Sequence, residues 1–212
     1  MKNNIIGRKS EQDTLARIYE SGQSEFVAVC GRRRVGKTFL VREYFEQEMV
    51  FQTSGLAGGN TQEQLKNFFY TLRRYDRNAT SVPHDWLDAF EMLITYLDSL
   101  NGIERKVVFL DELPWMDTAG SNFISALEHF WNGWASARRD IVLIVCGSAT
   151  SWMMDKLINN HGGLYGRLTH RLFLQPFSLG ESEAFLKTKG MMRSRYEMAE
   201  LYMTLRSSSG WV

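Results

Sequence analysis

The stretch GRRRVGKT, residues 31–38, lies between an apolar run, EFVAVC (25–30), and a segment of helical character, FLVREYFEQ (39–47). It matches the pattern G-x-x-x-x-G-K-[ST], whose glycines let the backbone approach a phosphate group closely. Such a loop must leave a buried strand and open a helix, and the flanking segments satisfy both conditions. The stretch therefore predicts a phosphate-binding loop whose backbone N–H groups converge on the anion at a helix N-terminus. A surface turn is the alternative.

The side chains of this loop have separate expected roles. Lys37 is expected to reach the β- and γ-phosphates of a nucleotide, and the Thr38 hydroxyl to bind Mg²⁺. The three arginines at variable positions are interpreted mainly as exposed loop residues or contacts to a partner domain; without a wider basic field, they support a nucleic-acid patch only weakly. The residues expected to contact the nucleotide are Gly31, Arg32, Arg33, Arg34, Val35, Gly36, Lys37, Thr38 and Phe39.

A second apolar strand ends in two acidic residues, in the stretch KVVFLDELPW (106–115). Asp111 is expected to hold Mg²⁺ through water. Glu112, at the same strand end, is expected to orient and deprotonate an attacking water. This pair favours hydrolysis over phosphoryl transfer to another substrate, and a solvated turn is the alternative.

The strand that follows along the chain, IVLIVCGSATSW (141–152), also ends in polar residues. A side chain at its tip could sense the γ-phosphate or align the water. Ser148 is the first choice for this role and Thr150 the second. For either residue, the N-cap of the next helix is an alternative.

Apolar runs alternate with longer stretches of 3.6-residue period, which predicts an α/β fold with a parallel sheet covered by helices. Thr61 and Gln64 have the spacing of a capping box. One face of the helix at 121–138 carries an aromatic stripe that predicts packing on the sheet. The predicted strands are 25–30, 49–54, 106–111, 141–148 and 170–176. The predicted helices are 37–47, 61–74, 85–100, 121–138, 180–188 and 195–206.

The composition is that of an ordinary globular chain of 212 residues, with a net charge of +1. This balance gives no global electrostatic reason to expect a nucleic acid or a membrane as partner. Cys30 and Cys146 lie in apolar runs and are expected to be buried, reduced thiols. The first residues have no apolar signal region, and the longest apolar run is too short to span a bilayer. A cytoplasmic protein is therefore expected.

With these residues in place, the chain resembles an AAA+/STAND-type P-loop ATPase, and more closely the archaeal-type ATPase family. The resembling segments keep the order of the family and extend from about residue 5 to 205. They are IIGRKSEQDTLARIYESGQSEFVAVCGRRRVGKTFLVREYF, VVFLDELPWMDT, LEHFWNGWASARRDIVLIVCGSATSW and GLYGRLTHRLFLQPFSLGE.

The resemblance implies a three-layer α/β/α sandwich with a five-stranded parallel sheet of order 5-1-4-3-2. It implies that the nucleotide binds at the carboxyl ends of the strands, with Ile6, Gly7 and Arg8 near the adenine and Ser148 in the sensor-1 region. It also implies an arginine finger acting in trans, for which Arg167 is the candidate and Arg171 the alternative. A surface arginine or an ion pair at the strand end is the other interpretation of Arg167.

The resemblance further implies an ATPase core at residues 1–178 and the start of a helical lid at 179–212. Family members continue beyond this point, so the ending RSSSGWV is expected to reflect a truncated lid. The expected function is binding and Mg²⁺-dependent hydrolysis of ATP, used as a conformational switch toward a protein partner that the sequence does not identify. The alternatives are a non-catalytic nucleotide-binding interaction module and a DNA-associated ATPase whose DNA contacts would need a further C-terminal region.

Overall fold

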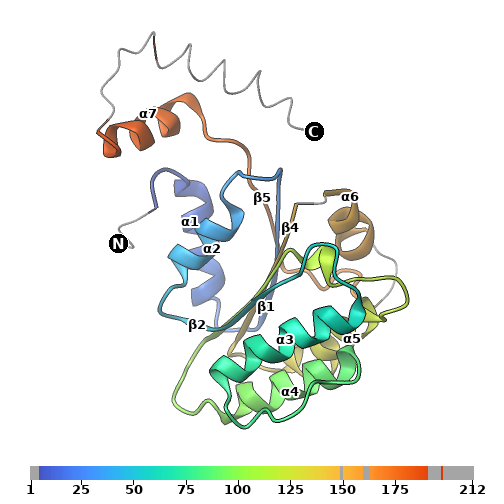
Figure 1. Ribbon diagram of the computed structural model, residues 1–212. Coiled ribbons are helices and arrows are strands. Elements are labelled where there is room, and N and C mark those ends of the chain that lie inside the picture. Colours follow the sequence, from blue (N-terminus) through green and yellow to red (C-terminus); the bar gives the residue numbers. More distant parts are fainter. Residues whose placement is uncertain (1–4, 149, 160–162, 191–196, 198–212) are drawn as a thin grey trace.

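The computed structural model describes residues 5–148, 150–159, 163–190 and 197 (Figure 1). Its centre is a five-stranded sheet in which every pairing is parallel. The order is β2-β3-β4-β1-β5, which is the predicted order read from the other edge of the sheet. The strands are β1 (Glu25–Cys30), β2 (Met49–Ser54), β3 (Lys106–Asp111), β4 (Ile141–Gly147) and β5 (His170–Phe173).

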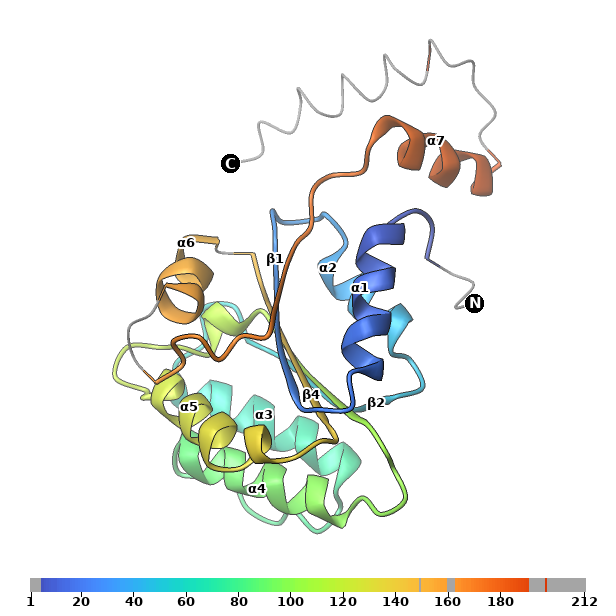
Figure 2. The same cartoon turned by 180° about the vertical axis from the view of Figure 1, so that it is seen from behind.

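Helices cover both faces of the sheet, which confirms the predicted three-layer arrangement. Helices α1 and α2 pack on one face, and α3, α4 and α5 on the other (Figures 1 and 2). The helices are α1 (Lys9–Glu20), α2 (Lys37–Tyr44), α3 (Thr61–Tyr75), α4 (Trp86–Ser99), α5 (Phe123–Gly133), α6 (Thr150–Met153) and α7 (Leu179–Thr188). None of those in the described part of the chain has the length and apolar composition needed to cross a membrane.

The two faces have separate apolar cores because successive side chains of a strand point to opposite sides. In β1, Val27 and Val29 pack toward α1 and α2, whereas Phe26 and Ala28 pack toward α3, α4 and α5. The strands β1, β3 and β4 are buried along their whole length, as expected of a parallel sheet covered on both faces. The aromatic stripe of α5 is part of the second core, which confirms its predicted packing role.

The predicted N-cap of α3 and the predicted ends of three elements are wrong. The helix predicted at 37–47 ends at Tyr44, and the strand predicted at 170–176 ends at Phe173. The N-cap of α3 is Asn60, whose side chain accepts from the Glu63 backbone while the Glu63 carboxylate accepts from the Asn60 backbone. Gln64 instead bonds Leu56 and Gly59 in the preceding loop. The helix predicted at 121–138 ends at Gly133 because the next residue leaves the helical region with φ −134°, and a short 3₁₀ turn follows.

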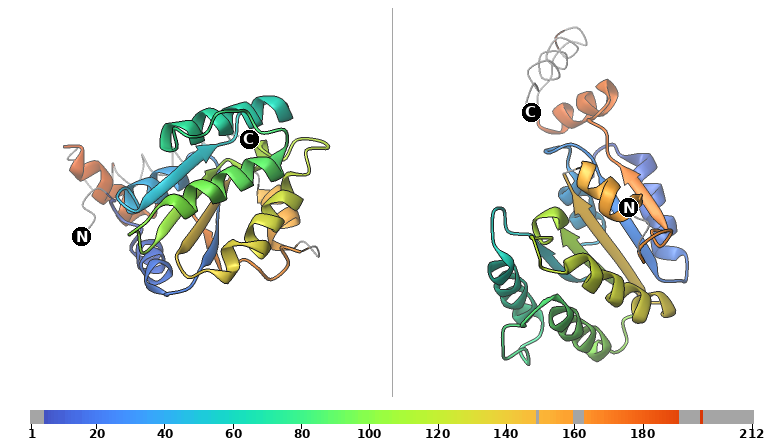
Figure 3. Two further views of the ribbon diagram at one scale, coloured as in Figure 1. Left: turned by 90° about the horizontal axis from the view of Figure 1, so that it is seen from below. Right: turned by 90° about the vertical axis from the view of Figure 1, so that its right-hand side faces the viewer.

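Helix α7 lies beyond the carboxyl end of β1 and beside the start of α1 (Figures 1 and 3). Helix α1 was not predicted as an element. The helix predicted at 195–206 lies outside the described residues, apart from residue 197. Strand β5 pairs parallel with β1, so the turn before β5 lies at the amino end of β1. The loop after β1 lies at the opposite end of the sheet.

Candidate nucleotide-binding site

The loop between β1 and α2 has the backbone that its glycines predict. Gly31 and Gly36 have φ values of 145° and 89°, and Arg34 between them has a φ of 65°. A Cβ on Gly31 would lie 2.5 Å from the backbone oxygen of Leu174, which follows β5. Glycine is thus needed at position 31 both for its φ and for the close approach of the two chains.

Lys37, the first residue of α2, folds back over this loop. Its Nζ donates to the backbone oxygens of Gly31 at 2.8 Å and Arg32 at 2.9 Å. Only 6% of the residue is exposed. The ammonium is therefore a nearly buried positive charge held by neutral carbonyls at the mouth of the loop, a setting that favours an anionic ligand.

Thr38, in the first turn of α2, meets Asp111 at the end of β3. The Thr38 hydroxyl donates to Asp111 Oδ2 at 2.8 Å, and Asp111 Oδ1 accepts from the Glu112 backbone N–H at 3.0 Å. Asp111 is 5% exposed. A hydroxyl and a carboxylate side by side are the hard oxygen ligands that Mg²⁺ prefers. The residues present therefore fit the predicted metal.

Glu112 and Ser148 meet where β3 and β4 end. Glu112 has a φ of 47°, and left-handed backbone is uncommon for a residue other than glycine. Its Oε2 accepts from Ser148 Oγ at 3.2 Å. Ser148 Oγ in turn accepts from Arg33 Nε at 3.4 Å. Thr150 begins α6, and its side chain lies outside the described part of the chain.

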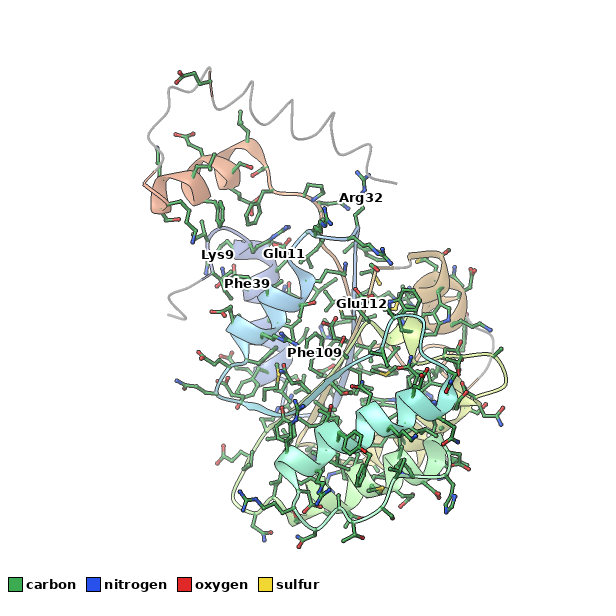
Figure 4. All side chains as sticks on the ribbon, in the orientation of Figure 1. Lys9, Glu11, Arg32, Phe39, Phe109 and Glu112 are labelled. Carbon is green, nitrogen blue, oxygen red and sulfur yellow. The ribbon has the colours of Figure 1, made fainter. Side chains whose placement is uncertain are left out.

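Figure 4 shows Arg32 on the loop and Glu112 at the end of β3, both at the same end of the sheet. Arg32, Arg33, Arg34 and Phe39 are exposed there, in keeping with their positions on the loop and the outer side of α2. The structure thus brings together the loop, the acidic strand end and the tip of β4. These three segments are far apart in the sequence.

The two cysteines lie beside this site as buried thiols. Burial raises the pKa of the Cys30 thiol to about 11, an effect that Lys37 opposes. Burial also raises the pKa of the Cys146 thiol strongly, and the negative charge of Asp111 adds to the effect. Both thiols are buried and free, as predicted, and both stay protonated near neutral pH.

The segment Ile6–Arg8 lies beside the loop, where Arg8 joins it to α7. Arg8 Nη2 donates to the Val35 oxygen at 2.9 Å, and the guanidinium lies 4.7 Å from the centre of the Phe177 ring. The Arg8 backbone N–H donates to Glu181 Oε1 at 2.8 Å. A Cβ on Gly7 would lie 2.8 Å from the Glu181 side chain. The adenine contact of these residues stays a prediction, whereas their contact with α7 is new.

Glu181 was missed by the sequence analysis, although a signal for it exists. Ser178 and Glu181 have the S-x-x-E spacing of a capping box, and the structure forms that box at the start of α7. Burial tends to raise the pKa of the Glu181 carboxyl, but hydrogen bonds from Arg8 and Ser178 outweigh it and lower the pKa. The carboxylate therefore stays charged in this contact.

Arg167 lies at the end of β1 that is far from this site. Thr169 donates to the Phe26 backbone oxygen, and His170 pairs with Val27. Arg167 is therefore level with the amino end of β1, whereas the loop follows its carboxyl end. At about 3.3 Å per residue, the length of the strand separates them. Both arginines are exposed, and Arg171 lies opposite Ala28, partway along β1.

The fold and the loop together define a class, that of P-loop ATPase domains. A profile described as an ATPase domain found predominantly in Archaea matches residues 6–202. The chain belongs to this family. The family was predicted from the resemblance, and the match confirms it.

Two curated relatives come from Methanocaldococcus jannaschii. An uncharacterized protein is 25% identical over 181 residues, which cover 85% of this chain and 38% of the relative. An uncharacterized ATP-binding protein is 32% identical over 50 residues, which cover 24% of this chain and 85% of that protein. The chain therefore spans less than half of the length of the first relative.

Solved structures share the fold at low sequence identity. The Walker-type ATPase of Pyrococcus abyssi has a TM-score of 0.66 and 18% identity, covering 93% of this chain and 63% of the other. The ORC2 protein of Aeropyrum pernix, in ADPNP and ADP complexes, has a TM-score of 0.60 and 21% identity, covering 92% and 54%. Drosophila ORC bound to DNA has a TM-score of 0.58 and 14% identity, covering 89% and 46%. At these identities the likeness shows the fold alone.

Proposed function

We propose that this domain binds ATP with Mg²⁺ and hydrolyses it to ADP and phosphate, as a conformational switch. The observation that carries the proposal is the 2.8 Å hydrogen bond between Thr38 and Asp111, beside Glu112. It joins the loop to the acidic strand end, and both parts are needed for phosphoryl transfer to water. Membership of an ATPase family supports the same reaction.

Each group has a role that follows from its position. The loop backbone and Lys37 bind the phosphates. Thr38 and Asp111 hold Mg²⁺, which when bound neutralises charge on the phosphate oxygens. Glu112 accepts a proton from the attacking water as the water oxygen bonds to the γ-phosphorus. The bond between that phosphorus and the bridging oxygen breaks, and its electron pair leaves with ADP. Ser148 orients the Glu112 carboxylate, to which it donates at 3.2 Å.

The switch role is supported by the link between the loop and α7. Arg8 donates to Val35 in the loop and its backbone donates to Glu181 in α7, so a shift of the loop changes the support of that helix. Helix α7 is proposed to belong to a lid region that follows a core at 1–178. An ATP-dependent switch of this kind would act in the cytoplasm, where ATP and Mg²⁺ are available.

A non-catalytic nucleotide-binding module is the main competitor, and Glu112→Gln separates the two. We expect the rate of phosphate release to fall about 10²- to 10⁴-fold in Glu112→Gln, because a general base contributes an effect of that size. The affinity for ATP should be retained. Glu91→Gln, an exposed substitution on α4, serves as the matched control. Turnover that is absent from the parent chain, or equal in Glu112→Gln and the parent, would favour the binding module.

Association with DNA or with a second copy is a further proposal. The likeness to an origin-recognition protein that binds DNA favours association with DNA, although a net charge of +1 gives DNA little attraction.

The exposure of Arg167 far from its own loop favours association with a second copy, because the arginine could then act on a neighbour. Turnover per molecule that rises with protein concentration, and falls in Arg167→Ala, would support self-association.

A further inference from the structure

Arg33 contacts the tip of β4 within the candidate site. Its Nε donates to Ser148 Oγ at 3.4 Å, and that hydroxyl donates to Glu112 Oε2 at 3.2 Å. Within the described part of the chain, no other hydrogen bond engages the Arg33 guanidinium. A guanidinium carries five N–H donors, so most of the Arg33 donors are available to a ligand.

The sheet explains why these three residues meet. Strands β1 and β4 are neighbours, with Cys30 opposite Gly147, so the loop after β1 lies against the tip of β4. Strand β3 pairs with β4 on its other side, with Leu110 opposite Val145. Arg33, Ser148 and Glu112 therefore follow the carboxyl ends of three adjacent strands.

A bound nucleotide would bring further negative charge to this edge of the sheet, beyond that of the side chains already there. Asp111 and Glu112 place two carboxylates beside the position at which a nucleotide's phosphates would bind. Lys37 supplies one positive charge from the loop side. A planar guanidinium can donate two parallel hydrogen bonds to phosphate oxygens, which an ammonium cannot do in a fixed geometry.

We propose that Arg33 contacts the γ-phosphate of ATP bound in its own chain, and so makes the site prefer ATP to ADP. The inference rests on the proposed function and names its specificity residue. Arg33 would pass from Ser148 to the phosphate, and Ser148 would remain on Glu112. Arg33 would then act as an arginine finger on the nucleotide of its own chain. Arg167, by contrast, is the candidate for a finger that acts on a second copy.

The proposal predicts a selective loss of affinity. Arg33→Ala should weaken the binding of a hydrolysis-resistant ATP analogue with Mg²⁺ by about 10- to 100-fold, the effect of losing a charged hydrogen-bond donor. ADP affinity should stay within about twofold, because ADP has no γ-phosphate. Arg33→Lys should recover part of the loss, because it keeps the charge without the fork. Arg74→Ala, an exposed arginine in the last turn of α3, should bind both nucleotides like the parent chain.

Calorimetry on the whole 212-residue chain tests this directly. Unchanged ADP affinity in Arg33→Ala also shows that the loop is still folded. Equal weakening of both nucleotides, or no weakening of either, would overturn the role of Arg33 and leave the proposed function standing. A parent chain that binds neither nucleotide would overturn both.

Discussion

The Thr38 hydroxyl donates to the Asp111 carboxylate across 2.8 Å, and so joins the first turn of α2 to the carboxyl end of β3. Asp111 is 5% exposed, so water does little to screen or replace this bond. The same two oxygens are those that the proposed function assigns to Mg²⁺. The contact is thus a structural tie and, under the proposed function, a preformed pair of ligands.

Removing the Thr38 hydroxyl should therefore change the metal dependence of ATP binding. We expect Thr38→Ala to raise the Mg²⁺ concentration at half-maximal binding by about tenfold or more. The substitution removes a ligand, and with it the hydrogen-bond donor that orients Asp111. Thr38→Ser keeps the hydroxyl and should stay within about twofold. A Mg²⁺ titration at fixed ATP measures both. Equal midpoints in all three proteins would contradict the assignment.

Glu181 should decide how firmly α7 is held against the loop. Its carboxylate accepts from the Arg8 backbone at 2.8 Å and from the Ser178 backbone at 2.9 Å. Loss of a capping interaction costs about 1 kcal/mol. We expect Glu181→Ala to speed amide hydrogen exchange in residues 179–188 by about fivefold. Lys187→Ala, which removes an exposed ion pair with Glu183 on the same helix, is the control. Exchange that is the same in both variants would mean that α7 is held by other contacts.

Asp140 should make stability depend on acid pH. Hydrogen bonds from Arg138 lower the pKa of its carboxyl strongly, and Lys106 adds to the effect at 2.6 Å. A folded-state pKa below the unfolded value of about 3.9 means that the unfolded chain binds more protons as the pH falls. The contribution of Asp140 is therefore present above about pH 4 and is lost below it.

Asp140→Asn removes this titration, so we expect its unfolding free energy to change less between pH 5 and pH 2 than that of the parent chain. Urea unfolding at several pH values measures the difference. Glu25 and Glu181, whose pKa values are also lowered, titrate in both proteins and cancel in the comparison. Parallel pH profiles would contradict the role of Asp140.

The local elements and the loop could be predicted because their signals lie within short windows. The run at 25–30, the glycines of the loop and the acidic end at 111–112 each have a pattern with few structural alternatives. The strand order came from the resemblance to a family and not from periodicity. The N-cap of α3 was ambiguous because Asn60 and Thr61 are both capping residues, and each has an acid or amide three residues later. Only the backbone conformation shows that Asn60, and not Thr61, is the N-cap.

Long-range contacts could not be predicted from the sequence in the same way. Arg8 and Glu181 are 173 positions apart, and Arg33 and Ser148 are 115 apart. No periodic pattern links such residues; the sheet order and the path of the chain after β5 bring them together. For this reason the sequence analysis treats Arg33 only as one of three exposed arginines, whereas the structure shows its contact with Ser148.

The most direct test of the central claim is a calorimetric titration of the chain with ATP and Mg²⁺, in parallel with Lys37→Ala. Lys37 is nearly buried at the mouth of the loop and places a positive charge there. We predict saturable binding in the parent chain and a loss of affinity of at least about tenfold in Lys37→Ala, the effect of removing a charged donor. Binding of equal strength in both proteins, or none in the parent chain, would contradict the claim that this loop binds ATP.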